Sequence, residues 1–99
     1  MVRPTSVRTR IAAETVGEHL LAWRKLQGLT AAQVADRAGI SRGTLRKLET
    51  GELGVGFEVF LNVTKVLGVL DLLVQALDPY ETELGRARAD QALPQRVRP

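Results

Sequence analysis

Apolar residues recur at helical spacing through the first two thirds of the chain. Val16, Leu20 and Trp23 stand at positions i, i+4 and i+7 with good helix formers between them. This pattern predicts a first helix over about residues 12–27, which ends at Gly28 because glycine is the usual residue just beyond a helix C-terminus. We expect Trp23 to lie in the core.

Two short helices separated by a glycine are predicted next. Thr30 and Gln33 have the spacing of a capping box, which places a second helix over about residues 31–38. Gly39 ends that helix, and Ser41 is the N-cap candidate of a third helix of about ten residues.

Two further apolar stretches complete the pattern. Residues 57–67 and 70–77 are expected to form a fourth and a fifth helix, the last of which stops before Pro79. The flanking residues 1–11 and 78–99 contain few apolar side chains, so we expect a mobile basic arm and a flexible basic tail around an all-α domain at 12–77.

The amino-acid composition limits the kinds of function that we expect of this domain. The chain has 99 residues, of which 44% are hydrophobic and 4% aromatic, which favours one small helical domain with an aliphatic core. There is no cysteine, and His19, expected to face solvent, is the single histidine. We therefore expect no enzyme, metal site or cofactor. The apolar stretches are too short to span a membrane and no signal-peptide core is evident, so the expected location is the cytoplasm.

Positive charge is concentrated in particular segments. The formal net charge is +3, and residues 29–50 carry +2 whereas residues 51–78 carry −3. In the third predicted helix, Leu45 and Leu48 share one side, and at about 100° per residue the nearly opposite side carries Arg42, Gly43, Arg46 and Lys47. A short helix with an apolar seam and a basic face fits the major groove of B-DNA, which is about 12 Å wide.

The segment from residue 29 to 51 resembles the Cro/repressor-type helix-turn-helix proteins, also called the XRE family. The resemblance is carried by Leu29-Thr30, Val34-Ala35, Ala38-Gly39-Ile40-Ser41 and Leu45-Arg46-Lys47-Leu48-Glu49-Thr50-Gly51. It extends over about residues 12–77 and implies a five-helix, lambda-repressor-like domain with its helix-turn-helix at 30–50. It also implies that the protein binds DNA as a two-fold dimer, with the third helix contacting the bases.

The resemblance and the helix starts together assign candidate DNA contacts. The base-reading positions are Ser41, Arg42, Gly43, Arg46 and Lys47; the charged ones could instead contact phosphate or stay solvated, and Gly43 offers only close backbone approach or a weaker helix. The candidate phosphate contacts are Thr30, Ala31, Gln33, Arg37 and Thr44. Many relatives carry glutamine at the position of Ala31, and alanine cannot make the same contact. The family pattern also pairs Arg24 with Glu49 in a structural ion pair.

The ends of the chain leave more than one interpretation open. The arm residues Arg3, Arg8 and Arg10 either reach DNA or solubilise a disordered end. The candidate homodimer interface is Val66, Val69, Leu70, Leu73, Val74 and Leu77, with a role in the monomer core as the alternative. The tail, with Leu84-Gly85-Arg86-Ala87-Arg88 and Leu93-Pro94-Gln95-Arg96-Val97-Arg98, resembles the endings of HipB-like antitoxins, which neutralise a HipA-like kinase toxin and repress their own operon.

Three functional hypotheses follow from the sequence. The first is an autorepressing antitoxin that binds a palindromic operator and a HipA-like kinase. The second is a free-standing XRE-family regulator without a toxin partner. The third is a protein-interaction module that has lost DNA binding, which a glycine in the DNA-contacting helix would permit.

Overall fold

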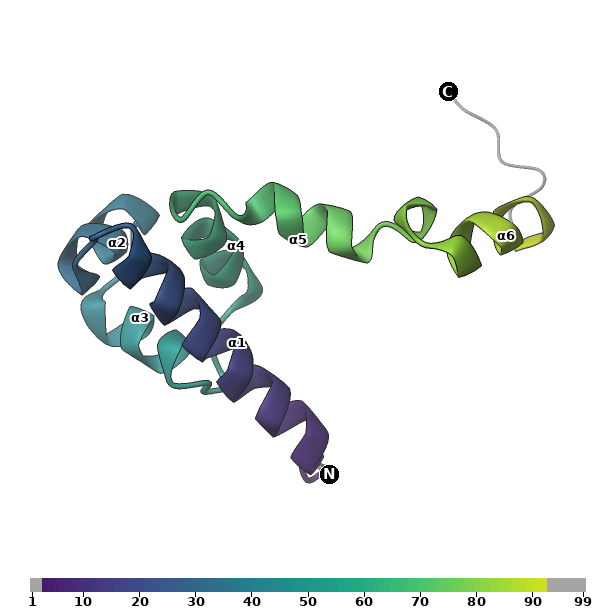
Figure 1. Ribbon diagram of the computed structural model, residues 1–99. Coiled ribbons are helices and arrows are strands. Elements are labelled where there is room, and N and C mark those ends of the chain that lie inside the picture. The colour runs from purple at the N-terminus through teal and green to yellow at the C-terminus, as the bar shows by residue number, and fades with distance from the viewer. Residues whose placement is uncertain (1–2, 93–99) are drawn as a thin grey trace. The chain divides into compact units, whose positions relative to one another are not determined.

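All regular structure in the described residues, 3–92, is helical in the computed structural model (Figure 1). The chain divides into two compact units, Met1–Val69 and Leu70–Pro99. The first unit contains α1 (Val7–Leu26), α2 (Ala31–Ala38), α3 (Arg42–Glu49) and α4 (Phe57–Val66). The second contains α5 (Leu70–Leu77), a 3-10 turn η1 (Pro79–Glu81) and α6 (Glu83–Ala92). The expected all-α class is therefore confirmed for this part of the chain.

The first helix begins earlier than the sequence pattern predicted. Ser6 is its N-cap, and the Ser6 hydroxyl accepts a hydrogen bond of 3.0 Å from the Thr9 backbone N–H. The expectation of a mobile arm is therefore wrong for residues 7–11, while Met1 and Val2 lie outside the described residues. Extending a helix that is already packed adds one backbone bond for each residue fixed, so these turns form although Val7 and Ile11 stay exposed.

The buried stripe of α1 is also displaced from the expected one. Gly17 and Leu20 are buried and Arg24 is half-buried, whereas Val16 and Trp23 are each 40% exposed. The prediction that Trp23 belongs to the core is wrong. His19 is exposed, as expected. The buried stripe of α1 therefore runs along the residues at which this helix approaches the neighbouring helices most closely.

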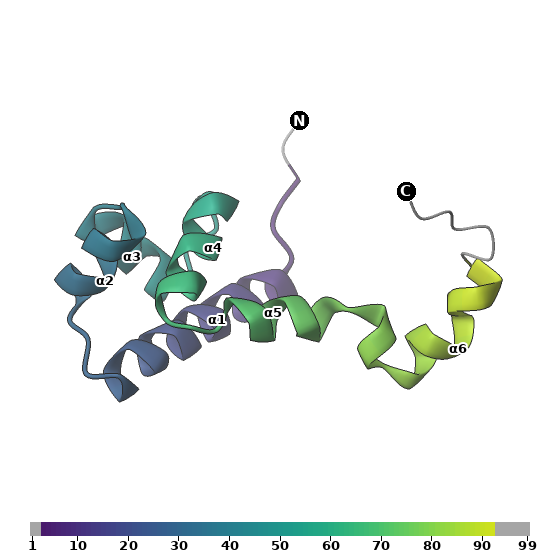
Figure 2. The same cartoon turned by 90° about the horizontal axis from the view of Figure 1, so that it is seen from above.

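Gly17 marks that close approach. A Cβ atom at this position would lie 2.6 Å from the backbone oxygen of Leu48 and 2.6 Å from that of Glu49, closer than such atoms can pack. The absence of a side chain therefore allows the backbone of α1 to rest on the C-terminal end of α3. Seen from above, α2, α3 and α4 all lie on one side of α1 (Figure 2).

The turn between α2 and α3 has the predicted local chemistry. The Thr30 hydroxyl accepts from the Gln33 N–H and the Gln33 side-chain oxygen accepts from the Thr30 N–H, which completes the capping box. Gly39 ends α2 with φ of 71°, a left-handed conformation that glycine adopts without strain. The Ile40 N–H then donates to the Ala35 carbonyl at 2.9 Å. α3 is two residues shorter than the ten expected, since it spans eight.

The first unit encloses an aliphatic core. Its buried members are Leu20, Val34, Ala35, Ala38, Leu45, Leu48, Val63, Leu67 and Val69. Val69, a member of the candidate dimer interface, is only 9% exposed within this cluster, so it takes the alternative role in the monomer core. Val66 packs partly against the same core. α4 ends one residue before the predicted Leu67, which serves as its C-cap.

The second unit is ordered by local hydrogen bonds. The Asp78 side chain accepts from the Tyr80 N–H at 2.9 Å and so caps η1. The Thr82 hydroxyl accepts from the Gly85 N–H at 2.9 Å and donates to the Pro79 carbonyl at 2.8 Å. The expectation of a flexible tail is therefore wrong for residues 79–92, and its remaining residues, 93–99, lie outside the described part.

Candidate nucleic-acid interface

The start of α3 is fixed by its cap. The Ser41 hydroxyl accepts from the Thr44 N–H at 3.0 Å and lies 2.9 Å from the Thr44 hydroxyl. Thr44 is half-buried. Both hydroxyls are thus engaged with each other, so the local role of Ser41 is to orient the first turn of the helix.

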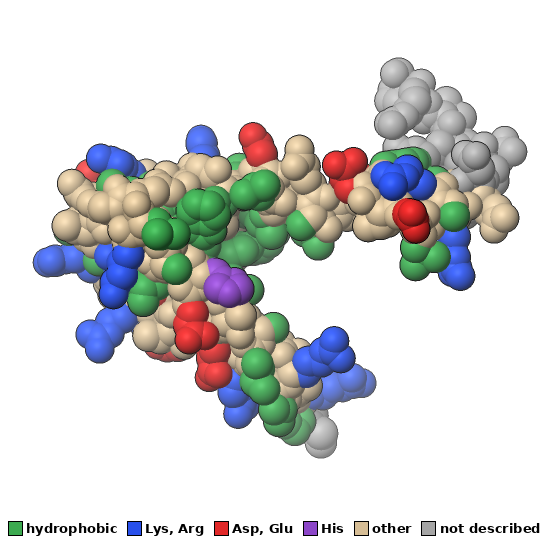
Figure 3. All heavy atoms as spheres, in the orientation of Figure 1, with side chains coloured by type: hydrophobic (Ala, Val, Ile, Leu, Met, Phe, Trp, Pro, Cys, Tyr) green, Lys and Arg blue, Asp and Glu red, His purple; other side chains and the backbone are tan. Residues whose placement is uncertain are grey.

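The two sides of α3 differ sharply in exposure. Leu45 is 1% exposed and Leu48 is 9% exposed, and these two side chains anchor the helix in the core. The four residues of the opposite side, Arg42, Gly43, Arg46 and Lys47, are all exposed. Lys and Arg side chains project around the end of the domain that carries α2 and α3 (Figure 3).

None of the three cations on this side of α3 forms an ion pair or a side-chain hydrogen bond with a described residue. A cation that is exposed and unpaired keeps its donors available for an anion or for the acceptors of a base edge. We call the side made by Arg42, Gly43, Arg46 and Lys47 the recognition face. The exposed cations of this face suit the binding of a polyanion.

The candidate phosphate contacts lie around α2 but differ in what they can donate. Thr30 and Gln33 are exposed and engaged in the capping box, which leaves the Gln33 side-chain N–H groups without a described partner. Ala31 is half-buried against the core and has no polar side chain. Arg37 is exposed near the end of α2.

Arg24 and Glu49 form a bidentate ion pair between α1 and the end of α3. The Arg24 Nε donates to Glu49 Oε2 at 2.8 Å and Nη2 donates to Oε1 at 3.2 Å. The two side chains are 13% and 10% exposed. Arg24 Nη1 also donates to the Leu29 carbonyl at 3.2 Å, so the same guanidinium holds the segment that leads into α2.

The pair also affects the protonation of the guanidinium. The hydrogen bond to Glu49 raises the pKa of Arg24, Coulombic attraction adds to this, and partial burial opposes it. A raised pKa favours the charged form, so the contribution of Arg24 to stability is fully present at neutral pH and is lost only at strongly alkaline pH.

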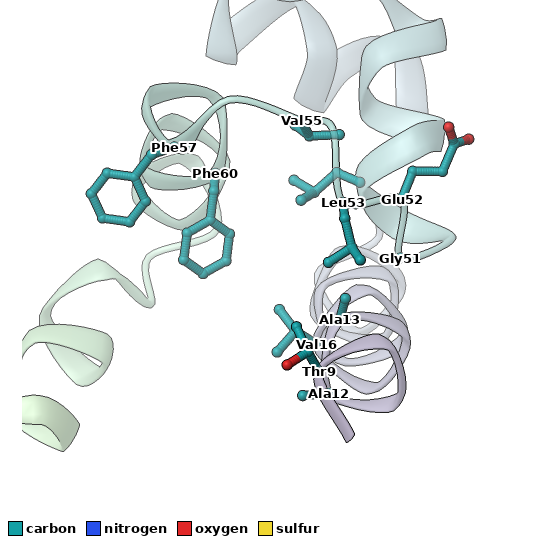
Figure 4. Close-up of a pocket in the computed structure, with 11 residues that line it drawn as sticks. Thr9, Ala12, Ala13, Val16, Gly51, Glu52, Leu53, Val55, Phe57 and Phe60 are labelled. Atoms are coloured by element: carbon teal, nitrogen blue, oxygen red, sulfur yellow. The ribbon is translucent and has the colours of Figure 1, made fainter. Parts of the chain in front are cut away.

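An apolar groove of about 380 Å³ lies elsewhere on the first unit, between α1, the loop after α3 and the start of α4 (Figure 4). Val16, Leu53, Phe57 and Phe60 contribute to its walls, and Glu52 is the single ionisable residue that lines it. A lone carboxylate provides no acid and base pair for catalysis.

Among residues 3–92, no group of His, Asp and Glu side chains is arranged to hold a metal ion. No helix in this range is long and apolar enough to cross a lipid bilayer.

The ion pair yields a prediction about stability. Arg24→Ala and Glu49→Ala should each lower the free energy of unfolding by about 1.5–3 kcal/mol, because each leaves a charged, poorly exposed partner without its hydrogen bonds. The double variant should lose less than the sum of the two, with a coupling of about 1 kcal/mol. Urea unfolding measures all three. Lys25→Ala, at an exposed position beside Arg24, serves as the control. If the losses in unfolding free energy from the two single changes simply add in the double variant, the predicted coupling between Arg24 and Glu49 is contradicted.

Comparison with known proteins places the domain in a family. No curated protein and no solved structure matches the chain. The family model described as a helix-turn-helix domain matches residues 15–77, which include α2, the Gly39 turn and α3. Such domains are typically found in regulators that bind DNA and lack enzymatic activity. Because the match spans more than half of the sequence, this chain belongs to the helix-turn-helix domain family of DNA-binding regulators.

Proposed function

We propose that this protein is a sequence-specific transcriptional repressor that inserts α3 into the major groove of double-stranded DNA. The observation that carries the proposal is the recognition face, on which three exposed cations lack a described partner while Leu45 and Leu48 hold the opposite side in the core. Most of the polar groups at the helix starts are used for caps, so the cations remain for the ligand. Such a repressor works in the cytoplasm, where its DNA lies.

Each residue of the proposed interface has a distinct role. Arg42 and Arg46 present guanidinium groups that suit the O6 and N7 acceptors of guanine, and Lys47 contacts a base or a phosphate. Thr30, Gln33 and Arg37 contact phosphate beside the start and end of α2, with Thr44 near the start of α3. Ala31 contributes through its backbone N–H alone.

DNA binding can be tested on a duplex enriched from a random library with the wild-type chain. Arg46→Ala should weaken binding to this duplex by about 1–3 kcal/mol and relax the base preference at one position, because a bidentate contact to guanine is lost. Arg42→Ala should show a similar loss. Fluorescence anisotropy across a salt series measures both the affinity and its salt dependence.

The matched control is Lys65→Ala, which removes one exposed positive charge from α4 instead of α3. It should leave the base preference unchanged. Wild-type binding that shows no salt dependence, or unchanged binding in both arginine variants, would refute the DNA-binding proposal and favour a protein-interaction module.

We further propose that two copies associate through α5. Leu72, Val74 and Leu77 on this short helix are 58%, 60% and 76% exposed, and Leu70 and Leu73 are half-buried. Leu70, Leu73, Val74 and Leu77 recur at helical spacing and form one stripe. A two-fold dimer would place two α3 helices on half-sites about 34 Å apart, which suits a palindromic operator.

The dimer predicts a specific response to added charge. Leu77→Asp should shift sedimentation at micromolar concentration from dimer to monomer, because a carboxylate would be buried in an apolar interface. Gln75→Asp adds the same charge about 160° away from Leu77 around the helix and should leave the dimer intact. A wild-type chain that sediments as a monomer would contradict the proposed interface.

We propose that the partner of this repressor is a HipA-like kinase toxin, and that the chain is its antitoxin and autorepressor. The sequence resemblance of the tail supports this, together with the exposed Leu84, Arg86 and Arg88 on α6. A free-standing regulator is the alternative, and it would lack a kinase-like neighbour.

The antitoxin proposal predicts that the product of an adjacent kinase-like reading frame copurifies with the full chain. Leu84→Asp should reduce this copurification because it removes an apolar side chain that is 63% exposed. Glu83→Asp on the same helix keeps its charge and should have no effect. Absence of such a neighbouring frame would favour the free-standing regulator.

A further inference from the structure

Gly43 lies at the centre of the recognition face. At about 100° per residue, the direction opposite the midpoint of Leu45 and Leu48 falls within about 10° of Gly43, with Arg46 and Lys47 about 50° to either side. A side chain at this position would point straight away from the core. It would therefore be the first to meet any surface that lies against α3.

The fold itself does not require glycine at this position. Gly43 lies within α3 and is not among the glycines with positive φ. A Cβ added here would meet only the Ser41 Oγ, at 3.8 Å, which is ordinary van der Waals contact. This contrasts with Gly17, where a Cβ would lie 2.6 Å from two backbone oxygens.

Glycine is also an unfavourable choice for a helix of eight residues. It loses more backbone freedom on folding than alanine does, so alanine would stabilise α3 at this position. Gly43 therefore weakens the helix and relieves no steric contact within the first unit. This indicates that the requirement for glycine comes from something that the chain binds.

We propose that Gly43 is a specificity-determining residue, at which the backbone of α3 meets the major-groove edges of the base pairs. The inference rests on the proposed DNA binding. Without a Cβ between them, the helix axis can lie closer to the floor of the groove, and Arg46 and Lys47 reach the base edges from either side. A methyl group at position 43 would hold the axis away and lengthen both contacts together.

The test compares folding with binding in the Gly43→Ala variant of the full chain. The thermal midpoint should rise, by up to about 4–8 °C, because alanine favours the helix. Affinity for the duplex selected by the wild-type chain should fall about tenfold or more. Affinity for a scrambled duplex of equal length and composition should stay unchanged, since this binding depends on charge and no charge is altered.

A matched control is Gly54→Ala in the loop after α3, where an added Cβ would have nothing within 4 Å. It should leave the ratio of specific to nonspecific affinity unchanged. A larger side chain, in Gly43→Val, should lower that ratio further than alanine does.

The possible results separate this inference from the proposed function. If Gly43→Ala keeps the wild-type ratio while Arg46→Ala lowers it, the role of Gly43 is refuted and DNA recognition by α3 stands. If the thermal midpoint falls instead of rising, the glycine serves the fold and the inference is also refuted. If Gly43→Ala, Arg42→Ala and Arg46→Ala all leave binding unchanged, the proposed function itself fails.

Discussion

The placement of the recognition face depends on the contact between α1 and the end of α3. Gly17 lets the backbone of α1 approach the carbonyls of Leu48 and Glu49, and the Arg24 guanidinium then holds the Glu49 carboxylate from the same stripe of α1. Because Arg24 also binds the Leu29 carbonyl, one side chain fixes the end of α3 and the segment that enters α2. The orientation of the recognition face is therefore set from the side opposite to it.

Polar groups in this unit are divided between holding the helices and facing solvent. The hydroxyls of Thr30 and Ser41 and the side-chain oxygen of Gln33 accept cap hydrogen bonds, and the Thr44 hydroxyl pairs with that of Ser41. No buried side-chain nitrogen or oxygen in the described residues lacks a hydrogen-bond partner. An unpaired polar group costs little at the surface and much in the core, so the unpaired cations of α3 are tolerated where they stand. The polar side chains of the described residues that have no protein partner therefore lie at the surface, where water or a ligand can reach them.

Local chemistry made part of this structure predictable from sequence. The Thr30–Gln33 capping box, the left-handed Gly39 and the Ser41 cap each act within a few residues, so the bounds of α2 and the start of α3 followed from spacing alone. The same kind of local bonding, at Asp78 and Thr82, orders the tail although it has few apolar residues to signal a helix. Hydrophobic periodicity identifies helices that face the core, but it does not detect segments that are ordered by caps.

The contact surface of α1 could not be predicted in the same way. Hydrophobic periodicity detects apolar side chains, and it cannot detect a contact that depends on the absence of a side chain. The apolar residues Val16 and Trp23 suggested one stripe, whereas the structure buries the stripe that contains Gly17 and Arg24. A glycine inside a helical pattern is the one available signal of such an approach, yet Gly17 and Gly43 give the same signal in sequence. Only the space around each distinguishes them: a backbone carbonyl fills the space at Gly17, and the space at Gly43 is open. The enclosed Gly17 is explained by what its helix packs against, whereas our proposal explains the open Gly43 by what its helix binds.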